Sequence, residues 1–454
     1  MANNKKKLTK KQKKTVRKVQ VTLSLILLVL LVGLFGFTYF MPYQAEPILK
    51  PIGMEFLLEY SPYYKVEEET PVQTPIETPI ETPVETPIEG GIVENIVYDD
   101  FQIHFIELGN EYAGDCTYIK AGDYDIIIDA GSRKGSAATI KKYVDQYCKD
   151  GVIEYVIATH AHEDHIAGFV GNKSGSSYTG ILYQYEIGTI IQYSLQNTTS
   201  QISKDMATAV KYCESKGTTV YTADECWNEE GDASRSFSLG EGMSLNIIYN
   251  LYYFEKSSDE NNYSVCTMFT YNEQNFFFTG DLEKHGEEKM ANYYDGSTLE
   301  KTLPHVSLFK AGHHGSPTSS NECLLEKITP DICAVCCCAG STEYTANYNN
   351  IFPSQDFITR IAKYTDRVYA TTMFNEKTKE FESMNGDIIV SSNGVAIGLS
   401  ATKNLTKLKD TEWFNETVYV DSDGNICSGK KKEDFFTETT PGVTAVPRRV
   451  WPTA

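Results

Sequence analysis

Three of the eight histidines in this 454-residue chain lie within six positions, in the segment I-A-T-H-A-H-E-D-H-I-A-G-F at residues 157–169. Imidazole and carboxylate groups are common ligands of zinc and related divalent ions. In an extended turn His160 and His162 point the same way, because side chains alternate with a period of two. Asp164 and His165 then lie on a different side, at the expected start of a helix. The pattern predicts ligands for two neighbouring divalent ions, since histidines that merely fill a core do not bunch at this spacing.

Two further segments end apolar runs with residues that could reach the same site. One is F-F-F-T-G-D at residues 276–281, and the other is F-K-A-G-H-H-G-S at residues 309–316. The second places His313 and His314 at the end of an expected strand, followed by Gly315, which allows the backbone to approach a site closely. The alternative for this pair is two solvated surface histidines.

Short apolar segments recur from about residue 92 and predict the strands that must position these side chains. Glycine, asparagine or aspartate bounds most of them, as strands require. The expected strands span 101–108, 118–120, 125–129, 155–159, 190–193, 244–249, 265–271, 275–279, 306–310 and 332–338. Helical patterns intervene, for example at 137–147 and 204–215. Many strands with interspersed helices predict an α/β or α+β body of sheets covered by helices.

The motif H-x-H-x-D-H after an apolar strand resembles that of the metallo-β-lactamase fold superfamily. I-I-I-D-A-G at residues 126–131 resembles the first motif of that superfamily, with Asp129 at the strand end, and F-F-F-T-G-D resembles the segment that supplies its bridging carboxylate. The resemblance implies an α/β fold, a four-layer αββα sandwich, for a hydrolase domain over residues 92–400. It also implies that Asp281 bridges two metal ions.

A closer resemblance is to the hydrolase domain of the competence DNA-uptake protein ComEC and its free-standing relatives, over about residues 98–400. It rests on A-G-D-C-T-Y-I at residues 113–119, N-N-Y-S-V at residues 261–265, the strand ending in T-G-D, and F-K-A-G-H-H-G-S.

Two features depart from these families. The wider superfamily has one more histidine before the bridging aspartate, whereas no histidine occurs here between His165 and His285. The ComEC-type relatives often carry His-Pro after the strand that matches 332–338, whereas this chain has Phe352-Pro353. The ligand set is therefore leaner than that of a complete two-metal site, and occupancy by a single ion stays open.

The roles expected of the site residues follow from the motif and the resemblance together. His160 and His162 are expected to serve one ion and Asp164 and His165 the other, with Asp281 between them. One of His313 and His314 is expected to complete a metal shell while the other faces the substrate, and the sequence does not decide between them. We take His313 as the ligand, and Asp164 and His314 as catalytic.

A metal-dependent hydrolase is the function that these residues predict. Two divalent ions about 3.5–4 Å apart can hold a hydroxide and lower the pKa of bound water towards neutrality. Zn²⁺ suits the imidazole-rich set, and Mn²⁺ suits a site where carboxylates dominate. The ComEC-type resemblance implies a phosphodiester substrate, so a phosphodiesterase or nuclease-like activity is expected.

The charge of the chain limits the case for nucleic acid as the substrate. Of the 41 basic residues nine lie in residues 1–20, which leaves 32 against 61 acids and a net charge of −29 for the remainder. DNA binding depends chiefly on basic side chains that neutralise phosphates. A small-molecule or cell-wall phosphodiester therefore fits as well. An acyl or lactam hydrolase and a surface-displayed binding module with a degenerate metal site remain as alternatives.

The first hundred residues predict attachment to a membrane. Residues 1–20 are basic, and the apolar segment within 21–43 matches the length of a single transmembrane helix. The positive-inside rule places the basic end in the cytoplasm and the remainder outside the cell. A cleaved secretory signal is the alternative to an uncleaved anchor. Residues 44–91 include five T-P repeats with proline at every fourth position, which predicts an extended extracellular stalk. The expected partners are the lipid bilayer and a phosphodiester, and no protein partner is predicted.

Two other segments carry predictions about structure alone. The run D-I-C-A-V-C-C-C-A-G, with Cys333 and Cys336–Cys338, is expected to form a buried strand, because cysteine behaves there as a small hydrophobe. Residues 401–454 are expected to form a small, partly disordered extension. It would contain a hairpin turning at Asp423-Gly424 and an unstructured end.

Overall fold

A computed structural model describes residues 91–453 except 111, 176, 376, 377, 379 and 428–441. The basic head (1–20), the apolar segment (21–43) and nearly all of the proline-rich segment (44–91) lie outside the described residues. Among the described residues, no helix combines the length and the apolar character that crossing a bilayer requires. The anchor and the stalk therefore stay predictions.

The first sheet contains nine strands in the described part of the chain, in the order β1-β19-β18-β2-β3-β4-β5-β8-β9. Its parallel part runs from β4 to β9, where α3, the α4–α5 segment and α6 connect successive strands. The strands are β1 (Ile92–Glu94), β2 (Phe101–Phe105), β3 (Thr117–Ala121), β4 (Tyr124–Ile128), β5 (Val152–Ala158), β8 (Glu186–Gln192), β9 (Thr219–Thr222), β18 (Ile388–Ser392) and β19 (Ile397–Ala401).

The second sheet contains eight strands within the described residues, in sequential order from β10 to β17. Strands β13 to β16 are parallel, and α8, α9 and α10 lie in the connections between them. The strands are β10 (Ser236–Ser238), β11 (Met243–Ile248), β12 (Cys266–Tyr271), β13 (Gln274–Phe278), β14 (Leu308–Lys310), β15 (Ile332–Ala339), β16 (Val368–Asn375) and β17 (Glu380–Ser383).

Helices and short elements complete the described structure. The helices are α3 (Ser136–Val144), α4 (Glu163–Val170), α5 (Ile181–Gln184), α6 (Gln201–Glu214), α7 (Ala223–Asn228), α8 (Lys284–Tyr293), α9 (Glu322–Ile328), α10 (Gln355–Ile361) and α11 (Glu412–Asn415). Short 3₁₀ turns are η3 (Leu251–Tyr253), η4 (Glu260–Tyr263), η5 (Leu299–Lys301), η6 (Gly312–Gly315) and η7 (Leu408–Asp410). Two small strand pairs are β6 (Lys173–Ser174) with β7 (Ser177–Tyr178), and β20 (Thr417–Val420) with β21 (Thr444–Pro447).

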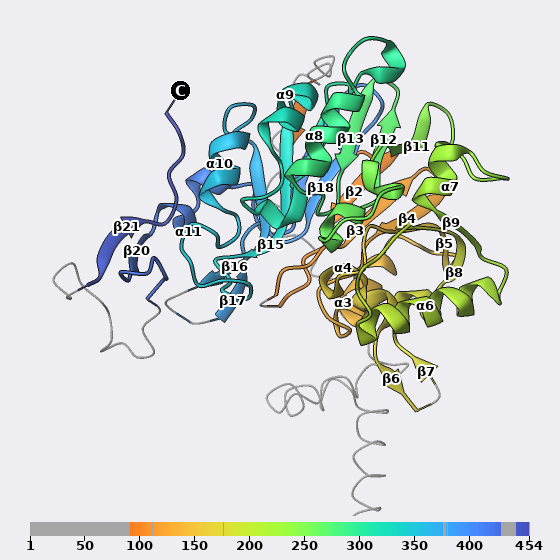
Figure 1. Ribbon diagram of the computed structural model, residues 1–454, viewed down its shortest axis with the longest axis horizontal. Coiled ribbons are helices and arrows are strands. Elements are labelled where there is room, and N and C mark those ends of the chain that lie inside the picture. The colour runs from red at the N-terminus through yellow and green to blue at the C-terminus, as the bar shows by residue number, and fades with distance from the viewer. Residues whose placement is uncertain are drawn as a thin grey trace, which may run out of the picture. The chain divides into compact units, whose positions relative to one another are not determined.

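The two large sheets pack face to face through aromatic side chains. Phe101 of β2 stacks on Phe276 of β13 with ring centroids 5.0 Å apart, and Phe105 lies 6.2 Å from Phe278. Helices α3, α4 and α6 lie on one side of the molecule and α8 and α9 on the other (Figure 1). The result is a mixed α/β fold with its core between the sheets, as the alternation of apolar strands and helical segments predicted.

Each strand predicted from the sequence overlaps an observed strand, and the cysteine-rich one is confirmed. Strand β15 is buried along its whole length, and its cysteines are free thiols. Strands β16, β18 and β19 were not predicted. They mix apolar residues with serine, threonine or glycine and show no shared alternation, so they carry a weak pattern and become strands by pairing with neighbouring strands.

The expectation of an unstructured end of the chain is wrong. Strand β21 pairs with β20, and Arg448 and Arg449 beyond it are 1% and 3% exposed. The turn at Asp423-Gly424 does form, since the Gly424 N–H donates to Asp421 O over 3.1 Å. The main partner of β20 is nevertheless β21, which the sequence did not indicate.

The guanidinium of Arg449 links the end of the chain to the loop before α10. Its Nε donates to Pro353 O over 2.8 Å, and its Nη2 donates to Ile351 O over 2.6 Å. The Ser354 N–H of the same loop donates to Gly315 O over 2.8 Å. The end of the chain is thereby connected, through one loop, to the segment that carries His313 and His314.

Replacing Arg449 with alanine should lower the free energy of unfolding by about 2–4 kcal/mol, because buried carbonyl oxygens lose charged donors. Urea denaturation of the full chain measures the change. Lys363→Ala is the control, because its pairing with Glu322 is largely exposed and contributes at most about 1 kcal/mol. Equal losses in the two variants would contradict a specific role for Arg449.

Candidate metal centre

The residues singled out in the sequence come together where parallel strands of both sheets end. In the first sheet, Asp129 follows β4 and His160 follows the neighbouring β5. In the second sheet, Asp281 follows β13 and His314 follows the neighbouring β14. Because the carboxyl ends of adjacent parallel strands share an edge, segments far apart in the chain can contribute to one site.

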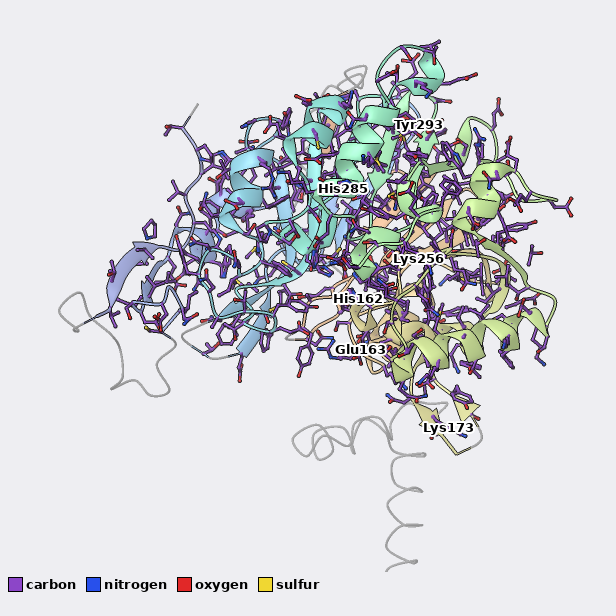
Figure 2. The ribbon with its side chains drawn as sticks, viewed as in Figure 1. His162, Glu163, Lys173, Lys256, His285 and Tyr293 are labelled. Carbon is purple, nitrogen blue, oxygen red and sulfur yellow. The ribbon has the colours of Figure 1, made fainter. Side chains whose placement is uncertain are left out.

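The turn from β5 to α4 begins a helix where the spacing predicted one, but the His160 ring lies 4.1 Å from the His165 ring and 4.8 Å from the His162 ring, so the two pairs of side chains are not separated. His162 occupies the N-cap position with extended backbone (φ −73°, ψ 151°), and α4 begins at Glu163. The rings of His160 and His162 are neighbours, with Nε2 of the first 3.0 Å from Nδ1 of the second. Asp164 and His165 lie in the first helical turn and are buried, whereas Glu163 is exposed. The labelled His162 and Glu163 mark this turn in Figure 2.

The T-G-D turn needs its glycine for space as well as for conformation. Gly280 has a φ of +53°, and a Cβ there would lie 2.7 Å from Ser264 Oγ and 3.0 Å from Thr159 Cβ. The same Ser264 hydroxyl accepts the Asp281 N–H over 3.0 Å. The close approach of the two sheets at this point fixes where the Asp281 carboxylate lies.

One oxygen of Asp281 is the point on which the imidazoles converge. Its Oδ2 lies 3.1 Å from His165 Nε2, 3.6 Å from His314 Nε2, 3.8 Å from His313 Nε2 and 4.0 Å from His160 Nε2. The carboxylate thus lies between the side chains of the first and second sheets, which is the position that a bridging ligand requires.

Four residues form a group that could hold a divalent ion. One ligand atom from each of Asp164, His165, Asp281 and His314 lies within 4.8 Å of all the others. Asp281 Oδ1 and His314 Nε2 are buried and have no hydrogen-bond partner. Two carboxylates and two imidazoles suit Zn²⁺ or Mn²⁺, so the donor set fits a metal.

His314 and His313 are in different surroundings. The ring of His314 is fully buried, and its Nε2 is 3.3 Å from Asp164 Oδ2. The ring of His313 is 20% exposed, and its Nδ1 is 3.4 Å from Glu283 Oε1. The four-residue group therefore includes His314, which the sequence assigned to catalysis, and not His313, which it assigned to the metal.

His160 and His162 make a leaner second group. Beside Asp281 they bring two imidazoles, and the hydroxyl of Ser264 lies 3.5 Å from His160 Nδ1. Burial holds the pKa of His160 well below its ordinary value, so this imidazole is neutral and able to bind a metal. The geometry indicates a fuller ligand set around His314 than around His162.

Neighbouring carboxylates favour the protonated form of two imidazoles in the site. Although burial opposes it, Asp281 and Asp129 hold the pKa of His165 well above its ordinary value. Against the same opposition from burial, Asp281 and Asp115 raise the pKa of His314 to about 10. A divalent ion bound here would displace these protons and supply the positive charge in their place.

Two residues that sequence analysis did not assign lie directly behind this group. Asp115 Oδ1 is 3.1 Å from His314 Nδ1, and the same carboxylate pairs with the ammonium of Lys310. The side chains of Asp115 and Lys310 are both 3% exposed. Burial would lower the pKa of Lys310, but Asp115 and Asp281 raise it above its ordinary value. The sequence signs that could have indicated them were a lysine at the end of an apolar strand, for Lys310, and an aspartate two residues before one, for Asp115.

Asp129 supports the other imidazole from behind. Its Oδ2 is 2.7 Å from His165 Nδ1, and its two oxygens accept the Thr159 N–H and hydroxyl over 2.8 and 2.6 Å. A carboxylate behind a ligating histidine fixes which ring nitrogen faces the metal. His165 has such a carboxylate partner, whereas His314 Nδ1 donates to the Cys336 carbonyl oxygen over 2.7 Å, with Asp115 Oδ1 3.1 Å away.

Aromatic side chains cover the outer side of the group. The Tyr344 hydroxyl donates to Asp164 Oδ2 over 2.5 Å, an interaction that no sequence motif indicated. The Phe352 ring lies 5.5 Å from the His313 ring and 6.1 Å from the His314 ring. Phe352 is thus an apolar wall against the two histidines.

The remaining histidines lie outside the site. His104 is buried in the core beside Tyr143, and burial lowers its pKa to about 3. His285 is exposed on α8 and appears apart from His162 in Figure 2. His305 is exposed and pairs with Asp331.

Residues 109–192 match the model of the metallo-beta-lactamase superfamily. The match begins before β3 and ends with β8, so it covers Asp129 and the H-x-H-x-D-H turn. The chain therefore contains a metallo-beta-lactamase superfamily domain. A particular closeness to ComEC-type proteins stays a prediction. No curated protein matches the sequence.

Several solved structures are similar to parts of this chain. The metallo-beta-lactamase fold protein YhfI from Bacillus subtilis shares 12% identity, covering 46% of this chain and 70% of its own, with a TM-score of 0.29. A putative metal-dependent hydrolase from Parabacteroides distasonis shares 13% identity, with coverage of 52% and 80% and a TM-score of 0.25. A Cronobacter sakazakii metallo-β-lactamase shares 15% identity, with coverage of 45% and 76% and a TM-score of 0.27.

His314→Ala should weaken metal binding more than His162→Ala does, because it removes one of four converging ligand atoms. We expect a loss of more than about 100-fold in affinity, beyond that typical of an outer supporting residue. Competition with a chromophoric zinc chelator measures it, with the exposed His305→Ala as the control. Retention of metal by His314→Ala together with its loss from His313→Ala would reverse the assignment of these two histidines.

Lys310→Met should destabilise the protein by about 3–5 kcal/mol, because it leaves the Asp115 carboxylate buried without its ion-pair partner. The double variant Lys310→Met with Asp115→Asn should recover part of this loss, since the uncompensated charge is gone. Asp115→Asn alone should weaken metal binding by about 10–100-fold. Urea denaturation and the chelator titration measure the two effects. A Lys310→Met variant as stable as the parent would show that the pair is not an energetic unit.

Proposed function

We propose that this protein is a metal-dependent hydrolase that cleaves phosphodiesters. The observation that carries the proposal is the convergence of Asp164, His165 and His314 on the Asp281 carboxylate, with all four side chains buried and ligand atoms within 4.8 Å. The superfamily match over residues 109–192 supports the hydrolase class. Bound divalent ions would supply a Lewis acid and lower the pKa of a coordinated water.

The chain's own residues would hold and orient the reacting groups. Asp281 would bind the cations together with the imidazoles of His165 and His314, which lie on either side of it. The Cys336 carbonyl oxygen and Asp129 hold His314 and His165 with their Nε2 atoms towards Asp281, and Asp115 lies beside His314 Nδ1. The Asp164 carboxylate, fixed by the Tyr344 hydroxyl, would orient the attacking water. The Phe352 wall would keep bulk water from one side of the site.

Two considerations favour a phosphodiester over an acyl substrate, and a third limits its size. The T-G-D and F-K-A-G-H-H-G-S segments that resemble ComEC-type relatives supply Asp281 and His314, two of the four grouped residues. The histidine that the wider superfamily places before the bridging aspartate is missing. The net charge of −29 beyond residue 20 does not favour a long polyanion, so a small phosphodiester is the proposed substrate.

The activity is testable with bis(p-nitrophenyl) phosphate and the full-length protein. We expect Zn²⁺- or Mn²⁺-dependent release of p-nitrophenol that a chelator abolishes. His162→Ala and Asp281→Ala should each lower kcat/KM by at least about 100-fold, while the exposed His285→Ala leaves it unchanged. Retained activity in both site variants would refute the assignment.

Two other outcomes would identify the alternatives. Turnover of nitrocefin without phosphodiesterase activity would indicate an acyl or lactam hydrolase. Absence of bound zinc or manganese after gentle purification, together with no turnover of either substrate, would indicate a binding module with a decayed site.

We further propose that residues 21–43 anchor the enzyme in the cell membrane with residues 44–454 outside the cell. The support is the uncharged apolar segment, the basic flank before it and the proline-rich repeats after it. Protease treatment of intact cells should remove the folded domain from the membrane fraction. A full-length protein recovered in the wash or the cytosol would contradict this placement.

A further inference from the structure

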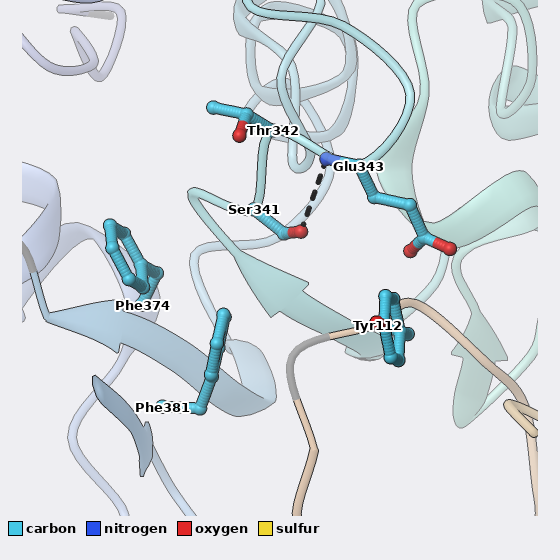
Figure 3. A pocket seen from close by; sticks show the side chains of 6 residues that line it. All are labelled: Tyr112, Ser341, Thr342, Glu343, Phe374 and Phe381. Carbon is cyan, nitrogen blue, oxygen red and sulfur yellow. Dashed lines mark hydrogen bonds between the residues drawn. The ribbon is translucent and has the colours of Figure 1, made fainter. Parts of the chain in front are cut away.

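A pocket of about 250 Å³ lies beside the metal centre and has no part in the chemistry described above. Aromatic rings, two hydroxyl-bearing side chains and one carboxylate line it, namely Tyr112, Phe374, Phe381, Ser341, Thr342 and Glu343. Phe381 and Tyr112 lie on opposite sides of the pocket, with Ser341 at its upper edge between them (Figure 3). Phe374 and Phe381 are directly paired across β16 and β17, with ring centroids 5.1 Å apart.

The loop that lines the pocket also reaches the metal centre. Residues 341–343 contribute to the pocket, and the next residue, Tyr344, donates its hydroxyl to Asp164 Oδ2 over 2.5 Å. A second segment that lines the pocket also reaches the metal centre. Its Tyr112 lies three residues before Asp115, whose carboxylate contacts His314 Nδ1. A ligand group held in this pocket therefore lies next to anything held at the metal centre.

Charge in the pocket is already balanced, which bears on the kind of ligand. The Glu343 carboxylate receives Arg133 Nη2 over 2.5 Å and the Ala113 N–H over 2.9 Å. A cationic ligand would have to compete with this arginine. The Arg133 guanidinium also stacks on the Tyr112 ring at 4.0 Å, which holds that ring in place. An uncharged ligand suits the pocket better than an ammonium group does.

Planar heteroaromatic groups fit this lining. Rings on two opposite walls can stack on the two faces of a flat ligand, and the Ser341 and Thr342 hydroxyls can bond to its polar edge. The volume suits one ring system rather than a chain of them. Combined with a phosphodiester centre next to it, such a pocket matches the base of a nucleotide.

We propose that this pocket binds the nucleobase of a small nucleotide phosphodiester whose phosphate lies at the metal centre. The inference rests on the proposed phosphodiesterase function for its substrate. It makes Tyr112 and Phe381 residues that determine specificity and do not take part in the chemical step.

The test compares a phosphodiester that carries a base with one that lacks it. Full-length protein is assayed with thymidine 5′-(p-nitrophenyl phosphate) and with methyl p-nitrophenyl phosphate. We expect kcat/KM to be at least about 10-fold higher for the thymidine ester, because base stacking favours it. Tyr112→Ala and Phe381→Leu should remove this preference by raising KM for the thymidine ester, with the methyl ester unaffected.

Controls separate stacking from folding. Tyr112→Phe keeps the ring and should retain the preference, and Phe254→Ala removes an aromatic side chain that is 42% exposed and does not line the pocket. Thermal melting checks that each variant is folded. Equal kcat/KM for the two esters in the parent, or equal losses on both esters in folded variants, would overturn the proposal.

A binding measurement distinguishes failure of this inference from failure of the proposed function. If neither ester is cleaved, the phosphodiesterase function fails, and isothermal titration with thymidine 5′-monophosphate decides the pocket by itself. Saturable binding that Tyr112→Ala weakens about 10-fold or more would support the nucleobase site. Absence of binding, or binding that is unchanged in Tyr112→Ala and Phe381→Leu, would overturn it.

Discussion

Four buried carboxylates within one small volume are the constraint on which the rest of this structure depends. Asp115, Asp129, Asp164 and Asp281 are each less than a tenth exposed, and burying so many like charges is costly unless cations or hydrogen bonds compensate them. Lys310 supplies one permanent positive charge. Protonated imidazoles can supply more in the metal-free protein, and divalent ions would supply more still. A divalent ion bound among these ligands would compensate much of this negative charge.

The fold meets this constraint by bringing the ends of two sheets to one place. The first sheet contributes the histidine-rich turn, and the second contributes Asp281 and His314. Small residues let these segments meet, as Gly280 does where a side chain would collide with Ser264. Asp129 behind His165 and the Cys336 carbonyl behind His314 then set ring orientation, so the geometry of the centre comes from buried support as much as from the ligands themselves.

Support for the centre extends to the last residues of the chain. Arg449 holds the loop that carries Phe352, and that loop packs against both the His313–His314 segment and the aromatic cover of the site. The strand pair β16–β17, at one edge of the second sheet, supplies the Phe374 and Phe381 rings of the pocket beside Tyr344. Segments far beyond the superfamily match at residues 109–192 therefore shape both the site and its immediate surroundings.

The sequence by itself determined the mixed α/β class, the buried cysteine strand and the residues that gather at the centre, because apolar periodicity and ligand spacing are local properties. It could not show that His314 rather than His313 joins the four-residue group, because ring orientation depends on Asp115 and on the backbone of another segment. Nor could it find Tyr344 or the buried arginines near the chain end, since an isolated polar residue carries no periodic signal. Their partners lie tens to hundreds of residues away in sequence, so only the packing of the two sheets and of the chain end decided what each one contacts.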